Sequence, residues 1–207
     1  EIDPFYKSVE LFYRPPKYSQ QSLYNELFQK IIKQNCNWLI ICDLDEFIFT
    51  PKGKQNLKEF LQSQPKNIGQ ISIPWLMFGS DGNISQPKSV IHGFKSRQKY
   101  DGTIKTEVKS IIRCDSVERL DLHKSFLKPE FDSFQVCDPL TEENIENSPI
   151  RLNHYAIQSL EFFEKVKMKR GDATSKNLQN VRTMEYFQLY DHKDLIDESL
   201  CNKYPIY

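Results

Sequence analysis

The spacing of apolar residues along the chain predicts helices that alternate with short buried strands. Apolar residues recur close to every 3.6 positions from Ser22 to Gln34, which indicates an amphipathic helix. The continuous apolar run Trp38–Cys42 follows, and such a run is typical of a central strand buried on both faces of an α/β sheet. Further helices are predicted at Asn56–Gln64 and at Leu160–Arg170, the second with Ser159 as its N-cap.

The remaining apolar segments predict the other strands. In chain order they are Val9–Tyr13, Ile68–Trp75, Val108–Arg113, Val117–Leu122 and Ile150–Ala156. The polar stretch Lys128–Pro149 is the candidate for a mobile loop, and helix is expected again at Asn177–Leu189. Helices that alternate with apolar strands predict an α/β fold with a mixed, mostly parallel central sheet flanked by helices.

Length and composition fit one globular domain. A chain of 207 residues buries enough surface to fold without a disulfide or a metal ion. Apolar residues make up 39% and charged residues 27%, as in soluble proteins. We expect a single domain over residues 1–207, with 171–207 as a C-terminal helical extension. Because the chain starts at Glu1 rather than Met, we expect a piece of a longer chain.

Charge and cysteine content narrow the class of partner. Lys plus Arg and Asp plus Glu both number 28, so the basic excess of a nucleic-acid binder is missing. No apolar run is long enough to span a bilayer. The five cysteines lack CxxC spacing, which favours reduced thiols. We therefore expect a cytoplasmic monomer, or a Golgi-lumen protein if a membrane anchor has been removed.

A pair of aspartates follows the apolar run that ends at Cys42. Residues alternate faces along a strand, so Asp43 and Asp45 of this Asp-x-Asp (DxD) motif point the same way. Open α/β sheets bind ligands at the carboxyl ends of their strands. Mg²⁺ and Mn²⁺ take such carboxylate ligands and bridge to substrate phosphates. The motif therefore predicts a metal–diphosphate site. The alternative is a loop that happens to begin with acidic residues.

Four segments in order along the chain resemble the motifs of one family. They are Trp38–Phe47 (WLIICDLDEF), Ile73–Gly82, Val108–Arg113, and Asn153-His154-Tyr155 followed by Ser159, Phe162, Lys165 and Arg170-Gly171. Together they resemble glycosyltransferase family 92 and the related family-2-like domains once called domain of unknown function 23. One segment departs from the family pattern, because no Lys-Asn-Glu strand precedes Val9, and this leaves the nucleotide open.

The resemblance implies a GT-A fold and a glycosyltransferase of the hexosyltransferase type. Such an enzyme moves a sugar from a nucleotide-diphosphate donor, here expected to be a UDP-sugar, to a hydroxyl of a glycan or protein-linked acceptor. It also implies that Asp45, Asp43 and His154 hold Mn²⁺ or Mg²⁺, which would neutralise charge on the UDP leaving group. The basic residues that the resemblance makes candidates for the diphosphate are Lys109, Lys165 and Arg170.

Several of these residues also admit a structural role. Asp81, in a glycine-flanked loop, is either the base that deprotonates the acceptor hydroxyl or the cap of a turn. Trp75 either stacks on a sugar or fills the core, and its neighbour Pro74 argues against a central strand and so favours the site. Outside its Asn-His-Tyr context, His154 would be a core residue. The remaining His and Lys residues near these motifs are expected at the surface: His123, Lys167 and Lys169.

Two other functions fit the aspartate pair. A phosphatase of the haloacid dehalogenase type also places Asp-x-Asp after an apolar strand, but a small residue follows the pair there, whereas Glu46 and Phe47 follow it here. A non-catalytic domain that binds a nucleotide sugar or a glycan would keep the same residues. Hydrolysis of a UDP-sugar in the presence of Mn²⁺ would separate these alternatives from a transferase.

Overall fold

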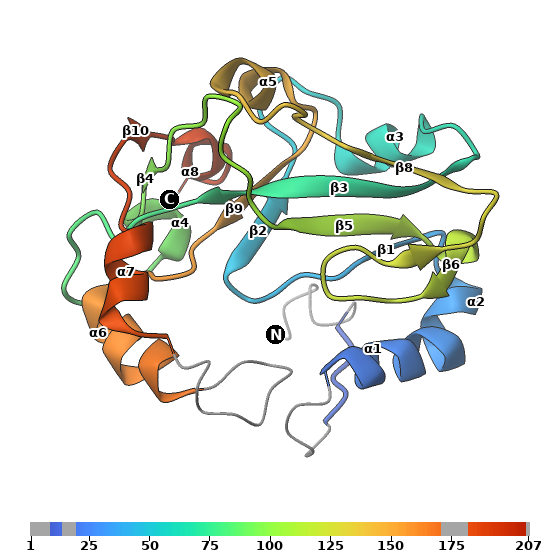
Figure 1. Cartoon of the computed structure of the whole chain (residues 1–207), viewed down its shortest axis with the longest axis horizontal. Helices are drawn as coiled ribbons and strands as arrows, with labels where there is room; N and C mark the ends of the chain where they lie inside the picture. The colour runs from blue at the N-terminus through green and yellow to red at the C-terminus, as the bar shows by residue number, and fades with distance from the viewer. Residues whose placement is uncertain (1–8, 14–19, 171–181, 206–207) are drawn as a thin grey trace.

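A six-stranded sheet forms the centre of the molecule (Figure 1). The computed structural model describes residues 9–13, 20–170 and 182–205. The strands follow the order β1-β5-β3-β9-β2, and β8 also pairs with β3. Their bounds are β1 Trp38–Ile40, β2 Glu46–Phe49, β3 Ile68–Met77, β5 Val108–Arg113, β8 Asp132–Gln135 and β9 Arg151–His154.

The sheet is mixed. The pairs β1–β5, β3–β5 and β2–β9 are antiparallel, and β3–β8 and β3–β9 are parallel. The expected α/β class with a mixed sheet is confirmed, but the sheet is not mostly parallel. The reason is that β5 lies between β1 and β3 and runs against both, while β2 runs against β9 at the other edge.

The predicted central strand Trp38–Cys42 is in fact an edge strand. Only Trp38–Ile40 pairs with the sheet, and all three residues are half-buried. The chain leaves the sheet at Ile41, which packs instead in a cluster with Phe28 and Ile112. The apolar run therefore reflects burial against a helix beyond the strand end as well as burial in the sheet.

The central strand is β3, and Pro74 is compatible with that position. The N–H of Trp75 donates to the carbonyl oxygen of Glu107 on the β5 side, so the nitrogen of Pro74 faces the opposite edge. That edge is shared by β8, which pairs up to Ser72, and by β9, which pairs from Trp75 onward. Pro74 therefore lacks its N–H at a position that pairs with neither β8 nor β9. The argument from Pro74 against a central strand is wrong.

Helices flank the sheet. In Figure 1, α1 and α2 (blue) lie at the lower right, and α6 and α7 (orange and red) lie at the lower left. The bounds are α1 Gln20–Leu27, α2 Lys33–Asn35, α3 Leu57–Gln62, α4 Val90–Gly93, α5 Glu142–Asn147, α6 Leu160–Lys165, α7 Met184–Tyr190 and α8 Ser199–Lys203. A π-helical turn, Phe28–Ile32, joins α1 to α2. No helix in the described part of the chain is long and apolar enough to cross a bilayer.

The predicted helices are present where the structure describes them. Asn56 forms a capping box with Glu59 at the start of α3, and the Ser159 hydroxyl accepts the N–H of Phe162 at the start of α6. The prediction Asn177–Leu189 lies partly outside the described residues, and α7 is its described part.

Two segment predictions are wrong. Residues 9–13 take no regular secondary structure, and Leu11 is 90% exposed, so the apolar residues there do not form a strand. The stretch Lys128–Pro149 is not an irregular loop, because it holds β8 and α5. Its polar residues fit an edge strand, which needs few apolar side chains, and a short helix capped by Thr141.

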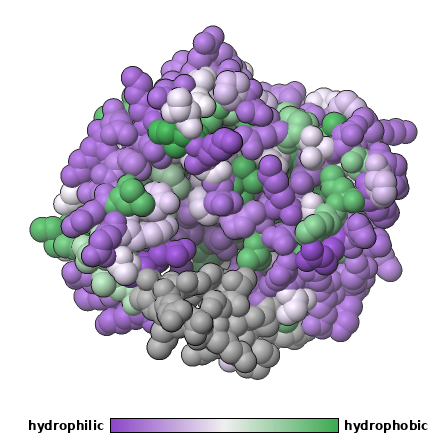
Figure 2. Space-filling view, viewed as in Figure 1, coloured by the Kyte–Doolittle hydropathy of each residue, from purple (hydrophilic) through white to green (hydrophobic). Residues whose placement is uncertain are grey.

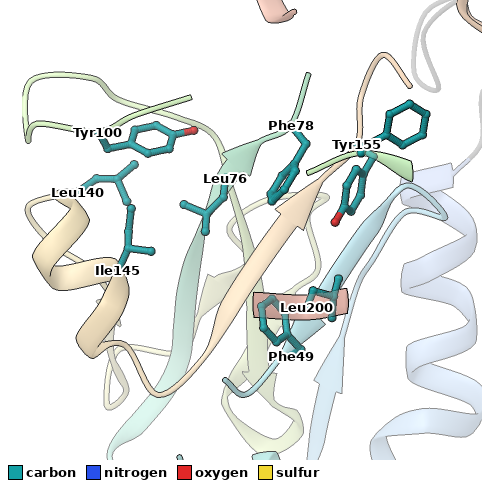
Figure 3. Close-up of a cluster of buried hydrophobic side chains, with 9 residues drawn as sticks. Phe49, Leu76, Phe78, Tyr100, Leu140, Ile145, Tyr155 and Leu200 are labelled. Atoms are coloured by element: carbon teal, nitrogen blue, oxygen red, sulfur yellow. The ribbon is translucent and has the colours of Figure 1, made fainter. Parts of the chain in front are cut away.

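Aromatic and aliphatic side chains fill the core between the sheet and the helices and loops that pack on it. Figure 3 shows one cluster, in which Phe49, Leu76, Phe78 and Tyr155 come from neighbouring strands and Leu200 from α8. The outer face in Figure 2 is largely hydrophilic, with apolar residues in small scattered groups. All five cysteines are free thiols, as predicted.

A second buried feature is an ion cluster, the Arg97 cluster, formed by Arg97, Glu142 and Asp197. Strand β4, Ser96–Arg97, pairs with β10, Leu195–Ile196. Arg97, whose side chain is 3% exposed, donates to both carboxylate oxygens of Glu142 at 2.9 and 2.7 Å and to Asp197 Oδ2 at 2.7 Å. The cluster therefore fastens the C-terminal segment to β4 and α5.

Candidate functional site

The aspartate pair lies in the turn between β1 and β2. The backbone N–H of Glu46 donates to the carbonyl oxygen of Asp43 at 3.1 Å, and the N–H of Asp43 donates to Glu46 Oε2 at 2.9 Å. Leu44, between the two aspartates, is fully exposed. The turn is thus closed by Glu46, which also begins β2, so the residue after the Asp-x-Asp motif fixes the motif's backbone.

Asp43 is held by a buried lysine of β5. Lys109 Nζ donates to Asp43 Oδ2 at 2.9 Å and lies 3.6 Å from Glu46 Oε2. The side chain of Lys109 is 2% exposed, whereas that of Asp43 is 42% exposed. Burial alone would lower the pKa of Lys109, but Asp43 and Glu46 raise it above its usual value. The ammonium therefore stays charged and tethers Asp43 at the rim of the site.

The pairing of β2 with β9 brings Asp45 to His154. Glu46 lies opposite His154 in the register, and the N–H of Tyr155 donates to the carbonyl oxygen of Asp45 at 2.9 Å. His154 Nε2 lies 3.9 Å from Asp45 Oδ1. Burial lowers the pKa of His154 to about 4, although Asp45 opposes the shift. The imidazole is therefore neutral near pH 7, which is the form that binds metal ions.

Asp45 has a counter-ion that the sequence analysis placed elsewhere. Lys167 Nζ donates to Asp45 Oδ2. Helix α6 ends at Lys165, and the chain continues as a 3-10 turn, Lys167–Lys169, in which the Lys167 side chain is 10% exposed. Burial would raise the pKa of Asp45, but Lys167 and His154 outweigh it and hold that pKa below its usual value.

Trp75 packs against two histidines, one of which is His154. Its ring centroid is 4.1 Å from that of His154 and 5.6 Å from that of His123. Three buried atoms here lack a hydrogen-bond partner, namely Trp75 Nε1, His154 Nδ1 and Glu46 Oε1, and they are half of the six such side-chain atoms among the described residues. Buried polar atoms are normally paired, so this concentration marks a place where a ligand or water completes the bonding.

The structure brings together five of the predicted site residues and separates the others from them. Asp43, Asp45, Trp75, Lys109 and His154 form one contiguous group through the contacts given above.

The other predicted residues make contacts elsewhere. Lys165 is 68% exposed and pairs with Glu161 at 2.6 Å, and Arg170 is exposed. The Asp81 carboxylate accepts the backbone N–H groups of Lys95 and Ser96, so it joins its loop to the segment that leads into β4.

Lys167 is the residue that sequence reasoning missed. It was expected on a solvated basic face with Lys169, but it is buried while Lys169 is exposed. The α-helical period of α6 does not continue past Val166, whose φ and ψ are −117° and −59°, so the facing of Lys167 does not follow from the helix pattern. The sequence offered no signal that separates Lys167 from its basic neighbours Lys165, Lys169 and Arg170.

A cleft of about 720 Å³ opens on the His123 side of Trp75. His123 lines it and is half-buried rather than fully at the surface, with Nδ1 3.0 Å from the carbonyl oxygen of Val108. Its wall mixes apolar residues with polar and charged ones, which besides His123 are Lys105, Thr106, Glu107, Asp121, Lys124, Gln135 and Asp138. His123, which lines the cleft, thus contacts the same indole ring as His154 of the candidate site.

Asp45 and His154 fit a divalent cation in donor type and spacing. Ligands of this kind lie about 2.0–2.2 Å from the metal, so two donors 3.9 Å apart can share one ion after a small shift. Among the described residues no group of three or more His, Cys, Asp or Glu side chains is arranged to hold an ion. Among the described residues, Asp45 and His154 are therefore the two close ligands, whereas Asp43 accepts a hydrogen bond from Lys109.

The comparisons with known proteins agree on one family. Residues 31–197 match the family model of glycosyltransferase family 92, and this range includes the aspartate pair, Lys109, His154 and Lys167. A glycosyltransferase family 92 protein of rice, Oryza sativa subsp. japonica, is 28% identical over 135 residues. That alignment covers 64% of this chain and 21% of the rice protein, so the chain spans about a fifth of that relative. This chain belongs to glycosyltransferase family 92.

Proposed function

We propose that this chain is a GT-A glycosyltransferase domain that moves a sugar from a UDP-sugar to a hydroxyl of a glycan or protein-linked acceptor. The observation that carries the proposal is the Asp45–His154 pair, in which Asp45 Oδ1 lies 3.9 Å from Nε2 of the buried His154, with the half-buried Asp43 beside it. Family membership supports the transfer of a sugar over the phosphatase alternative. The UDP-sugar donor and the acceptor are those that the family resemblance implies, and they are part of the proposal.

A divalent cation, Mn²⁺ or Mg²⁺, would be held by Asp45 Oδ1 and His154 Nε2. When bound, the cation supplies positive charge that stabilises the diphosphate leaving group. Trp75 fixes the imidazole plane by packing on it, and burial keeps His154 neutral. Asp43 accepts hydrogen bonds from Lys109 at 2.9 Å and from Gln20 at 3.3 Å, and its side chain is 42% exposed, so its carboxylate can accept a further hydrogen bond from a water of the cation or from the ribose.

The chain's other residues would position the two substrates. Lys167 is the basic side chain nearest the proposed cation and is a candidate for the donor diphosphate in place of Lys165. The cleft beside His123 would receive the acceptor, since its amide, hydroxyl and carboxylate groups suit sugar hydroxyls. Asp81, with both oxygens on backbone N–H groups, remains a prediction as the catalytic base.

The test is Mn²⁺-dependent hydrolysis and transfer from UDP-sugars. We expect Asp45→Asn and His154→Gln each to lower the rate about a hundredfold or more, because each removes a group that fixes the charge at the leaving group. Asp115→Asn is the control, since Asp115 is exposed in a turn away from the site, and it should leave the rate unchanged.

Three outcomes are informative. Activity that survives Asp45→Asn would exclude the proposed site. Binding of UDP-sugar with no turnover on any acceptor would favour the non-catalytic binding domain. Release of phosphate from a sugar phosphate would favour the phosphatase.

A further inference from the structure

Lys167 occupies the place where positive charge is needed on Asp45, and this suggests a second property of the site. We propose that Lys167 is an exchangeable counter-ion. It neutralises Asp45 while no cation is bound, and it moves to the donor diphosphate when a divalent cation takes over that carboxylate. The inference rests on the proposed function, because it assumes that Asp45 is a cation ligand.

The ammonium group of Lys167 and a divalent cation would compete for the carboxylate of Asp45. Asp45 is 14% exposed, and its Oδ2 accepts from Lys167 while its Oδ1 faces His154 Nε2 at 3.9 Å. A dication between Oδ1 and Nε2 would therefore lie on the same carboxylate as the ammonium. Like charges this close repel strongly when water is largely excluded. Cation binding is thus opposed for as long as Lys167 stays on Asp45.

The charge of the site supports the exchange. Without a cation, Lys109 and Lys167 face the carboxylates of Asp43, Asp45 and Glu46, so two positive charges meet at most three negative ones. A dication then leaves an excess of positive charge in a buried site, which is costly until an anion arrives. A diphosphate is such an anion, and its oxygens are strong acceptors for an ammonium group. Cation and diphosphate should therefore each strengthen the binding of the other.

The two lysines differ in how firmly they are held. Lys109 stands on the sheet strand β5 and lies near two carboxylates, those of Asp43 and the fully buried Glu46. Lys167 stands on a short 3-10 turn outside the sheet and has one acceptor, Asp45, among the described residues. Its flexible four-carbon stem can redirect the ammonium without moving the backbone. Lys167 is therefore the lysine suited to exchange, and Lys109 the fixed one.

The experiment measures Mn²⁺ affinity by electron paramagnetic resonance, without and with UDP, and UDP affinity at saturating Mn²⁺ by calorimetry. For the wild type we expect UDP to tighten Mn²⁺ binding about tenfold or more, since a hydrogen bond to a charged group corresponds to roughly this factor. Lys167→Met should bind Mn²⁺ alone about tenfold more tightly, and UDP about tenfold more weakly, because it removes both the competitor and the diphosphate partner.

Matched variants keep the outcome interpretable. Lys169→Met removes a charge from the same turn, where the side chain is exposed, and should behave as wild type. Lys167→Gln keeps a donor for Asp45 Oδ2 without the charge, so it shows the same opposite changes if Lys167→Met fails to fold. Lys167→Arg keeps the charge and should still resist Mn²⁺ alone.

Two results would overturn the inference, and they are distinguishable from a failure of the proposed function. If Mn²⁺ and UDP bind normally but Lys167→Met and Lys167→Gln bind Mn²⁺ alone no more tightly than wild type, the exchange does not occur while the cation site stands. If the wild type binds no Mn²⁺ even with UDP, and Asp45→Asn changes nothing, the cation site itself is wrong.

Discussion

Two buried charge clusters in this fold differ in how fully their groups are paired. In the Arg97 cluster, the guanidinium donates to both oxygens of Glu142, to Asp197 and to the carbonyl oxygen of Gln98. In the candidate site, by contrast, Glu46 Oε1, Trp75 Nε1 and His154 Nδ1 have no partner. Both clusters join segments far apart in the sequence, but only the first has its polar atoms satisfied by the protein alone.

The difference separates a structural role from a binding role. A fully paired cluster gains nothing from a ligand, because every donor and acceptor is already used. A cluster with orphaned atoms carries a cost that a ligand can remove. On the proposed function, the buried charges of the two clusters do not by themselves distinguish them, whereas the incomplete pairing of the candidate site does.

Removal of the guanidinium should have the largest effect on stability. Arg97→Met leaves the partly buried carboxylate of Glu142 without its counter-ion and the buried carboxylate of Asp197 with only the longer contact to Arg151, at 3.9 Å. We expect a loss of about 3–5 kcal/mol in the free energy of unfolding. Urea denaturation measures it. Arg97→Lys, which keeps the charge but not the bidentate geometry, should lie between. A loss below about 1 kcal/mol for Arg97→Met would remove the contrast between the clusters.

The pH dependence of stability should divide into two windows. The folded-state pKa of His154 is depressed to about 4, so the unfolded chain takes up a proton below its ordinary pKa, near 6.5, before the folded chain does. Stability should therefore be complete above about pH 6.5 and fall by about 3 kcal/mol as the pH drops to about 4.

The Arg97 cluster should respond only at lower pH. Burial would raise the pKa of Glu142 and of Asp197. Hydrogen bonds and charge outweigh burial and lower both pKa values, chiefly from Arg97 for Glu142 and from Ser199 and Arg97 for Asp197. Their contribution to stability is therefore present above their unfolded pKa values and lost in acid. In His154→Gln, the free energy of unfolding should change little with pH above about pH 4.5, while the loss at lower pH that comes from the Arg97 cluster should remain. Free energies of unfolding at each pH measure both. An unchanged profile in His154→Gln would contradict the assignment.

Removal of the fixed lysine of the site should cost less than removal of Arg97. In Lys109→Met, Asp43 can turn to water because it is 42% exposed, and Glu46, whose pKa burial raises, can take up a proton. We expect a loss of about 1–3 kcal/mol in the free energy of unfolding, recovered in part at lower pH. Denaturation at pH 5 and pH 8 measures it. A loss equal to that of Arg97→Met would show that both clusters are equally rigid.

The smallest effect is expected for an exposed lysine of the same basic stretch. Lys165 pairs with Glu161 four residues earlier, and its side chain is 68% exposed. Lys165→Met should change the free energy of unfolding by less than about 0.5 kcal/mol, as exposed pairs of this kind do. Thermal denaturation compares it with Lys167→Met. A larger change for Lys165 than for Lys167 would reverse the distinction between buried and exposed lysines.

The sequence predicted those elements whose local pattern matches their final environment. Strand β3 is buried almost throughout, so its apolar run is unambiguous, and the capping box at Asn56 marks the start of α3. Strand β8 was missed because an edge strand needs no apolar run, and three of its four residues are exposed. The edge position of β1 depends on β5 pairing between β1 and β3, which no local pattern records.

The sequence predicted those residues of the candidate site that lie in recognisable motifs. The aspartate pair, Lys109, Trp75 and His154 come from segments that each carry a pattern, and the sheet brings them together. Lys165 and Lys167 are two positions apart with the same charge, and only the change from α-helix to 3-10 turn decides which one points inward. That change is a property of tertiary packing.

The pairing of β2 with β9 also constrains when the site can form during synthesis. Asp43 and Asp45 leave the ribosome early, Lys109 follows, and His154 and Lys167 come much later. A nascent chain that ends before β9 can tether Asp43 through β5, but it lacks His154, one of the two proposed ligands. On the proposed function, loading with metal through Asp45 and His154 would therefore report that β9 has paired with β2.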